Sequence, residues 1–392
     1  MHYDPYSRAM QLDPYPSYRW FREHEPCSHN REKDFYALFR FEDVWNATLD
    51  WQTMSSSLGP ILENRGQIPG EVFSIIGMDP PRHTRLRNLV SRGFTPRRIA
   101  MLEKEVRQIA AQHLDPLRDA HAFDLQQEFS VKLPMDVISA LLGIPEQDRD
   151  MYRGWVDKAL SRDPDSGAPP EQTALELASS RQYILDLLRE RRANPREDLI
   201  SVIAHAEYEE PDGRRRQLDD GEVSSFVNLL AAAGAETTAK LIGNAIVYLW
   251  QRPEQRRFLW EDRSRIPRAI EEILRFDAPS QFQGRVALRE SVWHGVSIPV
   301  GARVALVTGA ACRDEREFPD PDRLDVTRAP AREIYFGHGQ HFCIGKSLAR
   351  IEARVALEEI GRRFPDYEVE ESGLTRTYQA HVRGFANVPV HV

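Results

Sequence analysis

Residues 336–345 read Phe336-Gly337-His338-Gly339-Gln340-His341-Phe342-Cys343-Ile344-Gly345, which puts one cysteine in a glycine-rich loop. An amphipathic helix is expected directly after the loop, from Lys346 to about Phe364, with an apolar stripe of Leu348, Ile351, Val355 and Ile360. A helix N-terminus offers unpaired N–H groups and partial positive charge, which lower the pKa of a nearby thiol. The spacing therefore predicts a thiolate at Cys343.

Two interpretations of this cysteine are open from its neighbours alone. Gly337, Gly339 and Gly345 lack a Cβ atom, so the loop can bend sharply and approach a large flat ligand. A thiolate bound to haem iron pushes electron density onto the metal and favours cleavage of an O–O bond. The alternative is an inert, buried structural cysteine in an ordinary loop.

The complete string closely resembles the haem-binding loop of the cytochrome P450 superfamily. The pattern of that loop is F-G-x-G-x-H/R-x-C-x-G, and every fixed position is present here. The resemblance implies haem b with Cys343 as the axial thiolate ligand of the iron. It also implies that Phe336, His341 and Gly345 lie beside the cofactor, and it extends from about Asp4 to Val392.

Length and composition are compatible with one large domain. With 392 residues, 41% of them hydrophobic, the chain can bury a sizeable core. No linker, low-complexity tract or repeat divides it, and the longest loop-like stretch covers only residues 162–170. The resemblance implies a single cytochrome P450 domain over residues 1–392, mainly α with a small β-rich part (α+β). Haem would lie between a long central helix and the helix after the cysteine loop.

Charge and cysteine content exclude several classes of protein. A formal net charge of −8 argues against a nucleic-acid partner, because phosphates require an excess of basic side chains. Cys27, Cys312 and Cys343 are odd in number and far apart, so we expect no disulfide framework or zinc cluster and a reducing, cytoplasmic location. The first twenty residues contain no apolar run long enough for a signal peptide or membrane anchor. We therefore expect no membrane partner, as in bacterial members of the family.

Four cationic or imidazole side chains are candidates for binding the haem carboxylates. A helix is expected after a pair of prolines, and it places His83 and Arg87 four residues apart on one face. On spacing alone, a solvated helix surface is the more ordinary interpretation. The resemblance implies that His83 and Arg87 hold one propionate, and a guanidinium forks well onto a carboxylate. It assigns Arg285, on an expected strand over residues 283–288, and His341 to the other propionate.

The longest expected helix begins near Leu218 and ends near Gln251. Asp219 followed three residues later by Glu222 predicts a capping box at its start. In the middle of this helix, four residues share one stripe, and three of them are small enough to leave room above a flat cofactor. The stripe consists of Leu230, Ala233, Gly234 and Thr237.

This middle stretch also interrupts an apolar run with an acid and hydroxyls. One explanation is structural, in which Thr237 bonds to the carbonyl one turn earlier and Glu236 points to solvent. The stretch Ala233-Gly234-Ala235-Glu236-Thr237-Thr238 also matches A-G-x-E-T-T, the oxygen-binding signature of the family. The resemblance implies that Ala233 and Gly234 lie against the cofactor. It makes Glu236 and Thr237 the catalytic residues, which deliver protons from solvent through an ordered water.

Glu272 and Arg275 share one face of a further expected helix. An E-x-x-R spacing alone is a weak signal, because such pairs are common at protein surfaces. In the family the same spacing marks a buried pair that a later arginine completes. The resemblance implies that Arg323 plays this part here.

The expected reaction is the insertion of one atom of O2 into an apolar, medium-sized organic substrate, such as a terpenoid, steroid, fatty acid or polyketide-like compound. No flavin or nicotinamide fingerprint is present, so NAD(P)H would act only indirectly, through a separate ferredoxin and its reductase. The substrate is expected to contact residues 59–76, 229–233, 279–283 and 378–380. The donor would dock on a basic surface of Lys346, Arg350 and Arg354, with Arg97, Arg98 and Arg332 as neighbours.

Two other functions compete with this one. A peroxide-driven haem-thiolate peroxygenase would need no proton relay, so the Glu236-Thr237 pair argues against it. A non-enzymatic haem sensor or carrier would need neither the pair nor a substrate pocket. A zinc site or a cysteine hydrolase is weaker still, because His338 and His341 near Cys343 lack a second ligand pair and a third group to orient a base.

Overall fold

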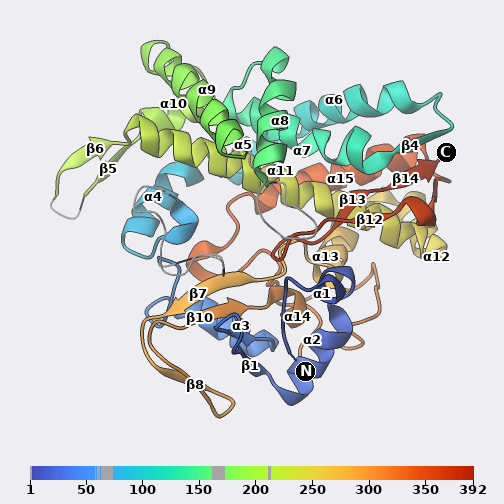
Figure 1. Ribbon diagram of the computed structural model, residues 1–392. Coiled ribbons are helices and arrows are strands. Elements are labelled where there is room, and N and C mark those ends of the chain that lie inside the picture. Colours follow the sequence, from blue (N-terminus) through green and yellow to red (C-terminus); the bar gives the residue numbers. More distant parts are fainter. Residues whose placement is uncertain (1, 58, 60–61, 63–73, 161–172, 211–212) are drawn as a thin grey trace.

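The computed structural model describes residues 2–57, 59, 62, 74–160, 173–210 and 213–392. Within these ranges most of the chain is helical, and Figure 1 shows most helices on one side of the molecule, with the largest sheet and the N-terminal helices on the other. The expected loop over residues 162–170 lies outside the described residues. The α-helices are α1 (Arg8–Leu12), α2 (Tyr15–His24), α3 (Phe41–Leu49), α4 (Arg82–Ser91), α5 (Pro96–Met101), α6 (Glu103–Leu114), α7 (Lys132–Leu142), α8 (Arg149–Leu160), α9 (Thr173–Ala193), α10 (Leu199–Ala204), α11 (Asp220–Trp250), α12 (Pro253–Glu261), α13 (Ile266–Phe276), α14 (Thr308–Ala311) and α15 (Lys346–Arg363).

The strands form small sheets. The largest has the order β1-β2-β10-β7-β3, in which β10 runs parallel to β2 and antiparallel to β7. The other sheets are β11-β14-β4 and the pairs β12-β13, β5-β6 and β8-β9. The strands are β1 (Cys27–Asn30), β2 (Phe35–Leu38), β3 (Met54–Ser55), β4 (Ala122–Asp124), β5 (Glu207–Glu209), β6 (Arg215–Gln217), β7 (Gln283–Ala287), β8 (Ser291–Trp293), β9 (Val296–Ile298), β10 (Arg303–Leu306), β11 (Glu368–Val369), β12 (Thr375–Arg376), β13 (Phe385–Asn387) and β14 (Pro389–His391). The expected mainly α fold with a small β-rich part is confirmed.

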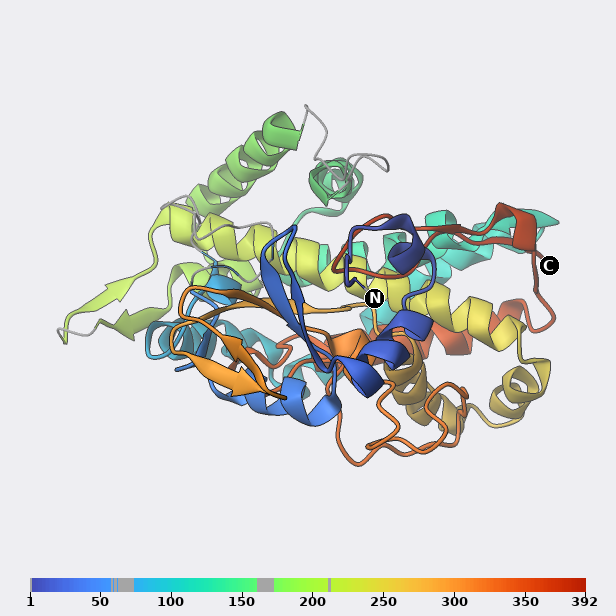
Figure 2. The ribbon, with the colours of Figure 1, turned by 60° about the horizontal axis from the view of Figure 1, so that its bottom comes forward.

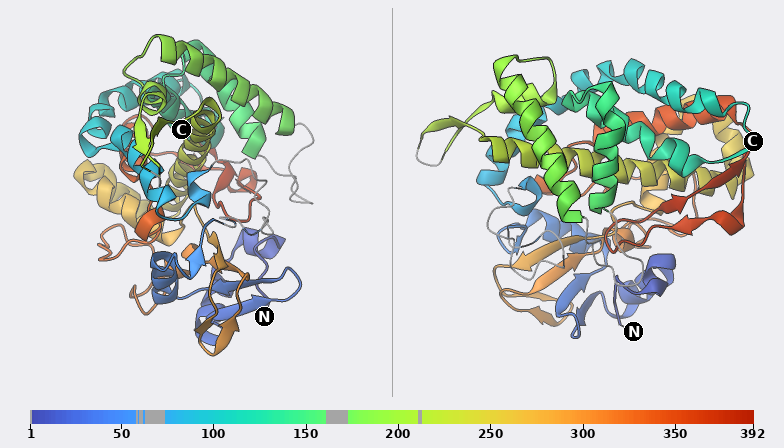
Figure 3. Two further views of the ribbon diagram at one scale, coloured as in Figure 1. Left: turned by 90° about the vertical axis from the view of Figure 1, so that its left-hand side faces the viewer. Right: turned by 45° about the horizontal axis from the view of Figure 1, so that its top comes forward.

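The central element is α11, which crosses the molecule in Figures 2 and 3. Its 31 residues span about 47 Å at the usual rise per residue. The predicted capping box is present, because the Asp219 carboxylate accepts from the Glu222 N–H at 2.8 Å and the Glu222 carboxylate accepts from the Asp219 N–H at 3.0 Å. The helix ends at Trp250, and Pro253 then begins α12.

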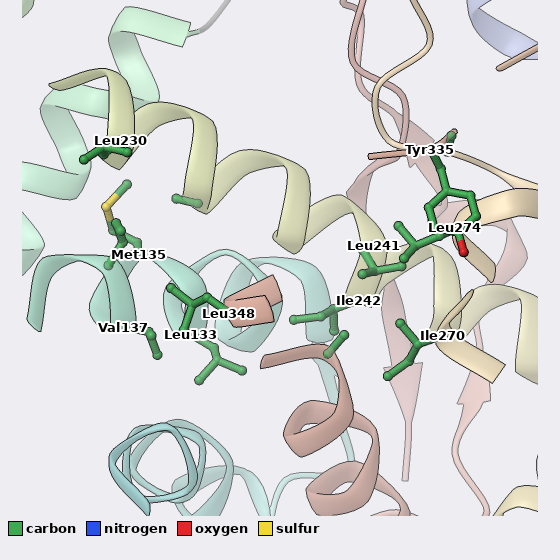
Figure 4. Close-up of a cluster of buried hydrophobic side chains, with 14 of the residues drawn as sticks. Leu133, Met135, Val137, Leu230, Leu241, Ile242, Ile270, Leu274, Tyr335 and Leu348 are labelled. Atoms are coloured by element: carbon green, nitrogen blue, oxygen red, sulfur yellow. The ribbon is translucent and has the colours of Figure 1, made fainter. Parts of the chain in front are cut away.

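One continuous apolar cluster packs around α11. Figure 4 shows part of it, with side chains from α7, α11, α13 and α15 turned toward one another. The labelled members are Leu133, Met135, Val137, Leu230, Leu241, Ile242, Ile270, Leu274, Tyr335 and Leu348. Because this large cluster joins helices from distant parts of the chain, and a smaller cluster packs under the N-terminal helices, we propose that residues 1–392 form one domain.

The E-x-x-R pair of α13 is fully buried, but its third partner is not the one expected. Arg275 Nε and Nη2 donate to the two Glu272 carboxylate oxygens at 2.7 and 2.8 Å. Arg328, with Nε 3.2 Å from that carboxylate, completes the cluster, so the assignment to Arg323 is wrong. The Asp325 N–H also donates to Glu272, and this turn of the chain brings Arg328 onto the carboxylate. Arg323 contributes only its backbone carbonyl, to Arg275 Nη2 at 3.3 Å.

Candidate active site

The cysteine loop contains two backbone conformations that favour glycine. Gly337 has a φ of 73° and Gly339 a φ of 65°, both in the left-handed region. A Cβ on Gly339 would also lie only 3.2 Å from the Leu49 side chain at the end of α3. The Cys343 N–H donates to the Phe336 carbonyl at 2.9 Å and closes the loop. These constraints present Cys343 directly before α15, as the sequence predicted.

The thiol of Cys343 is more strongly affected by burial than by the helix terminus. Burial raises its pKa above the ordinary value of 9.0. The backbone N–H groups of Gly345 and Lys346 and the charges of Arg87 and Arg350 act in the opposite direction, and burial outweighs them. The predicted effect of the helix N-terminus is present, but the protein alone does not lower the pKa. A bound cation is the physical means by which such a thiol becomes a thiolate.

A cavity of about 310 Å³ lies between α11, the cysteine loop and α15. The predicted small-residue stripe of α11 lines one side of it and the cysteine loop lines another. The predicted residues on its wall are His83, Arg87, Leu230, Ala233, Gly234, Thr237, Arg285, Phe336, His341, Cys343 and Gly345. Tertiary structure has therefore brought these residues, which come from four separate segments, around one space.

The four side chains predicted to bind carboxylates gather on this wall. His83, on α4, has its ring centroid 4.2 Å from that of His341 in the cysteine loop. Arg87, one turn later on α4, donates to the Phe342 carbonyl. Arg285, on β7, is buried and donates to a backbone carbonyl at 2.7 Å. The helix, the loop and the sheet each contribute to this cluster.

This cluster has unused hydrogen-bonding capacity. Both ring nitrogens of His83 and Nε2 of His341 are buried without a partner among the described residues. Burial, with a smaller contribution from Arg87, lowers the pKa of His83 to about 4, and burial lowers that of His341 to about 3. Burial also lowers the pKa of Arg285 to about 10. Buried donors of this kind are stabilised by an anionic ligand that accepts their hydrogen bonds.

The acid and the alcohol on α11 point in different directions. Thr237 lines the cavity and its hydroxyl donates to the Ala233 carbonyl at 2.9 Å, so the back-bond that spacing allowed is present. Glu236 is half-buried and is not among the residues of the cavity wall. Its Oε1 accepts a hydrogen bond from Gln379 Nε2 at 2.7 Å. The acid thus lies next to the cavity rather than in it.

Sequence reasoning missed a carboxyl group on the cavity wall. Glu352, on α15, is buried, and the Thr238 side chain of α11 acts to lower its pKa, though less than burial raises it. Burial raises the pKa of Glu352 well above its usual value, which favours the protonated form. The signal was available, because Glu352 falls between Leu348 and Val355 in the apolar stripe of α15.

The expected substrate-contacting segments are placed unequally. Ile75, Ile76, Leu229, Pro279 and Ser280 line the cavity, together with Val90, Phe94, Ile138, Phe226 and Gln283. Residues 60–61 and 63–73 of the first segment lie outside the described residues. Residues 378–380 do not line this cavity; the turn that carries them is joined to residues 279–281 by the hydrogen bond from the Gln281 N–H to the His381 carbonyl.

Comparison with known proteins matches a family model described as Cytochrome P450 to residues 170–382. A putative cytochrome P450 123 of Mycobacterium tuberculosis is 40% identical over 99% of this chain and 96% of its own length. The chain belongs to the cytochrome P450 family. A vitamin D(3) 25-hydroxylase of Pseudonocardia autotrophica is 37% identical over 99% of this chain and 96% of its own. The structure of cytochrome P450 CYP109Q5 from Chondromyces apiculatus superposes with a TM-score of 0.89 at 33% identity, covering 100% of this chain and 98% of that one.

This protein is therefore a cytochrome P450 monooxygenase, whose family uses O2 and a haem bound by a cysteine thiolate, with electrons ultimately from NAD(P)H. The residues around the cavity fit that group. Small side chains of α11 face the cysteine loop across the cavity, which leaves room for a flat macrocycle. The unpaired nitrogens of His83 and His341, with Arg87 and Arg285, suit its two carboxylates. Cys343 offers the sulfur, which haem iron accepts as an axial ligand.

The basic surface expected near Cys343 is largely neutralised by carboxylates. Arg350 is paired with Glu271 at 2.7 Å and also contacts Glu333. Glu333 lies 3.5 Å from Lys346, and Arg354 is paired at 2.7 Å with Glu103 of α6.

Among the described residues, no helix is long and apolar enough to cross a membrane.

Proposed function

We propose that this cytochrome P450 inserts one oxygen atom of O2 into an apolar, medium-sized organic substrate. One C–H bond becomes a C–OH group, the second oxygen atom leaves as water, and two electrons and two protons are consumed. The haem supplies the oxygen-activating chemistry when it is bound. The residues of this chain bind the haem and the substrate, exclude bulk water and supply the protons.

The observation that carries this proposal is the relation of Glu236 and Thr237 to the cavity. Thr237 lines the cavity opposite Cys343, and the adjacent Glu236 lies outside its wall. In the proposed route, Glu236 collects a proton on its outer side and Thr237 presents a hydroxyl inside. A peroxygenase would not need such a route, because hydrogen peroxide already carries both protons.

Haem binding is proposed for a defined set of residues. Cys343 is the metal ligand, and His83, Arg87, Arg285 and His341 hold the carboxylates. Ala233, Gly234, Phe336 and Gly345 form the flat walls of the haem site. Ala233 and Gly234 suit this role because a larger side chain would occupy the space over the macrocycle.

The substrate class follows from the chemistry of the wall. The described part of the cavity away from Cys343 is mostly aliphatic and aromatic, with Ser280 and Gln283 as polar exceptions. A terpenoid, steroid, fatty acid or polyketide-like compound with few oxygen atoms suits such a lining. The relative named for 25-hydroxylation of vitamin D(3) acts on a molecule of this kind.

Electrons are proposed to come from a separate ferredoxin and its reductase. The chain carries no nicotinamide or flavin fingerprint that would let it accept hydride itself. The three cysteines are unpaired, which agrees with a protein that functions in a reducing cytoplasm.

The first experiment is the absorption spectrum of the reduced, carbon monoxide-bound protein. A thiolate-ligated haem is expected in the wild type, and Cys343→Ser should lose that spectrum. A histidine-type spectrum in native wild-type protein would reject the proposal. Vitamin D3, progesterone and palmitic acid should then be titrated for the spectral shift that marks loss of water from the iron. Oxygenated product that requires NADPH, ferredoxin and reductase supports a monooxygenase, whereas product formed only with added peroxide supports a peroxygenase.

A further inference from the structure

The hydrogen bond between Gln379 and Glu236 joins two parts of the chain that are 143 residues apart. Gln379 lies in the turn between β12 and β13, near the C-terminus, and Glu236 lies in the middle of α11. The bond is short, at 2.7 Å, and both side chains are half-buried. A donor on a carboxylate forms a charge-assisted bond, which is stronger than a bond between neutral groups.

The turn that carries Gln379 is attached to the wall of the substrate cavity. The Gln281 N–H donates to the His381 carbonyl at 2.9 Å, and the Arg383 N–H donates to the Pro279 carbonyl at 2.8 Å. An isolated β-bridge pairs Ser280 with Val382 between these two bonds. Pro279 and Ser280 line the cavity, so the turn is bonded directly to that part of the wall.

Helical geometry explains why Glu236 needs a partner outside the cavity. Consecutive residues of an α-helix point about 100° apart, so Glu236 turns toward the C-terminal turn while Thr237 turns inward. A glutamate side chain has three rotatable bonds and loses considerable freedom when it is held in one place. The Gln379 amide offers a donor that fixes the carboxylate one residue from Thr237.

We propose that Gln379 is a positioning residue for Glu236, and that it ties the supply of protons to the wall of the substrate cavity. The inference rests on the proposed role of Glu236. The amide is suited to this task because its NH2 group only donates, so it selects the carboxylate as its acceptor. A substrate that presses on Pro279 or Ser280 thereby influences the acid that feeds Thr237.

The bond itself is tested by a double-mutant cycle on the haem-loaded protein. Thermal unfolding is compared for wild type, Gln379→Leu, Glu236→Ala and the double variant. The two single changes in Tm should not add, because either one already breaks the bond. Gln127→Leu is the matched control, since Gln127 Nε2 donates at 2.7 Å to the Ala386 carbonyl of the same hairpin without contacting Glu236. The change in Tm caused by Gln127→Leu should add to the change caused by Glu236→Ala.

The functional role is tested by the fate of oxygen when NADPH, a plant-type ferredoxin and its reductase drive turnover without added substrate. Gln379→Leu should raise the share of electrons released as hydrogen peroxide severalfold and change the D2O effect on O2 consumption. Gln379→Glu should change both measurements more strongly, because the introduced carboxylate would repel that of Glu236. Gln127→Leu should match the wild type in both measurements. A loss of general stability alone would not change the D2O effect.

Glu236→Gln separates the two hypotheses. If it raises peroxide release while Gln379→Leu and Gln379→Glu do not, the positioning role is wrong and the proposed function stands. If Glu236→Gln changes neither measurement, the proposed role of Glu236 is wrong, and the inference about Gln379 falls with it. Additive Tm changes in the cycle would also overturn the inference.

Discussion

The Arg328 guanidinium lies 3.2 Å from the carboxylate of Glu272, which is fully buried and already paired with Arg275. One acid thus balances two arginines inside the protein, at the junction between α13 and the chain that leads to the cysteine loop. A buried ion pair adds little compared with apolar packing, but removal of one partner leaves a charge without compensation. The cluster therefore makes the fold sensitive to single substitutions.

Glu272→Ala should lower the free energy of unfolding by about 3–5 kcal/mol, because the fully buried Arg275 and the half-buried Arg328 would remain without an acid. Arg328→Met should cost about 1.5–3 kcal/mol, the range for a hydrogen bond to a charged group. Arg323→Met is the control, because its side chain is exposed and only its carbonyl joins the cluster. It should stay within about 0.5 kcal/mol. Denaturant unfolding measures all three, and equal losses for the two arginine variants would contradict the assignment.

Arg285→Gln should make the loaded protein lose haem about tenfold faster or more, since a bond to a charged acceptor is replaced by a weaker one. The rate of haem transfer to apomyoglobin measures this directly. Arg289→Gln, an exposed position just beyond β7, should leave that rate unchanged. If both variants release haem at the wild-type rate, Arg285 does not hold a carboxylate of the cofactor.

Thr237→Ala should increase the share of electrons that end in hydrogen peroxide about tenfold, because the hydroxyl that faces the cavity is lost. The helix should be little affected, since the lost bond to the Ala233 carbonyl is worth about 1 kcal/mol. Thr237→Ser keeps the hydroxyl and should stay close to the wild type. Peroxide formed per NADPH oxidised is the measurement, and wild-type coupling in Thr237→Ala would remove Thr237 from the proposed route.

Glu352→Gln should change how stability depends on pH. The pKa of Glu352 in the folded protein lies well above its usual value, so the folded state holds a proton that the unfolded chain releases. The free energy of unfolding therefore falls as the pH rises above the pKa that Glu352 has in the unfolded chain, by at most about 1.4 kcal/mol per pH unit. Glutamine cannot ionise, so the free energy of unfolding of the variant should rise relative to that of the wild type as pH rises from 5 to 9. Parallel curves from denaturant unfolding at each pH would mean that Glu352 is not held neutral.

Local patterns predicted much of the fold and of the candidate site. The capping box of α11 depends on residues three apart, and the apolar stripe of α15 depends on helical period, so both are visible in a short window of sequence. The resemblance supplied the grouping of His83, Arg87 and Arg285, which no periodicity could have placed together. The third partner of Glu272 was missed because the path of the chain between Arg323 and Arg328 has no local signature.

The sequence by itself determined the elements and the chemistry of the cysteine loop, because glycine positions, helical period and capping are properties of neighbouring residues. Only the tertiary structure decided which distant groups meet: Gln379 with Glu236, and Glu352 with Thr238. It also decided that burial raises the pKa of Cys343 despite the helix terminus beside it. The physical reason is the same in each case, since desolvation and long-range contacts depend on what the folded chain packs against a residue.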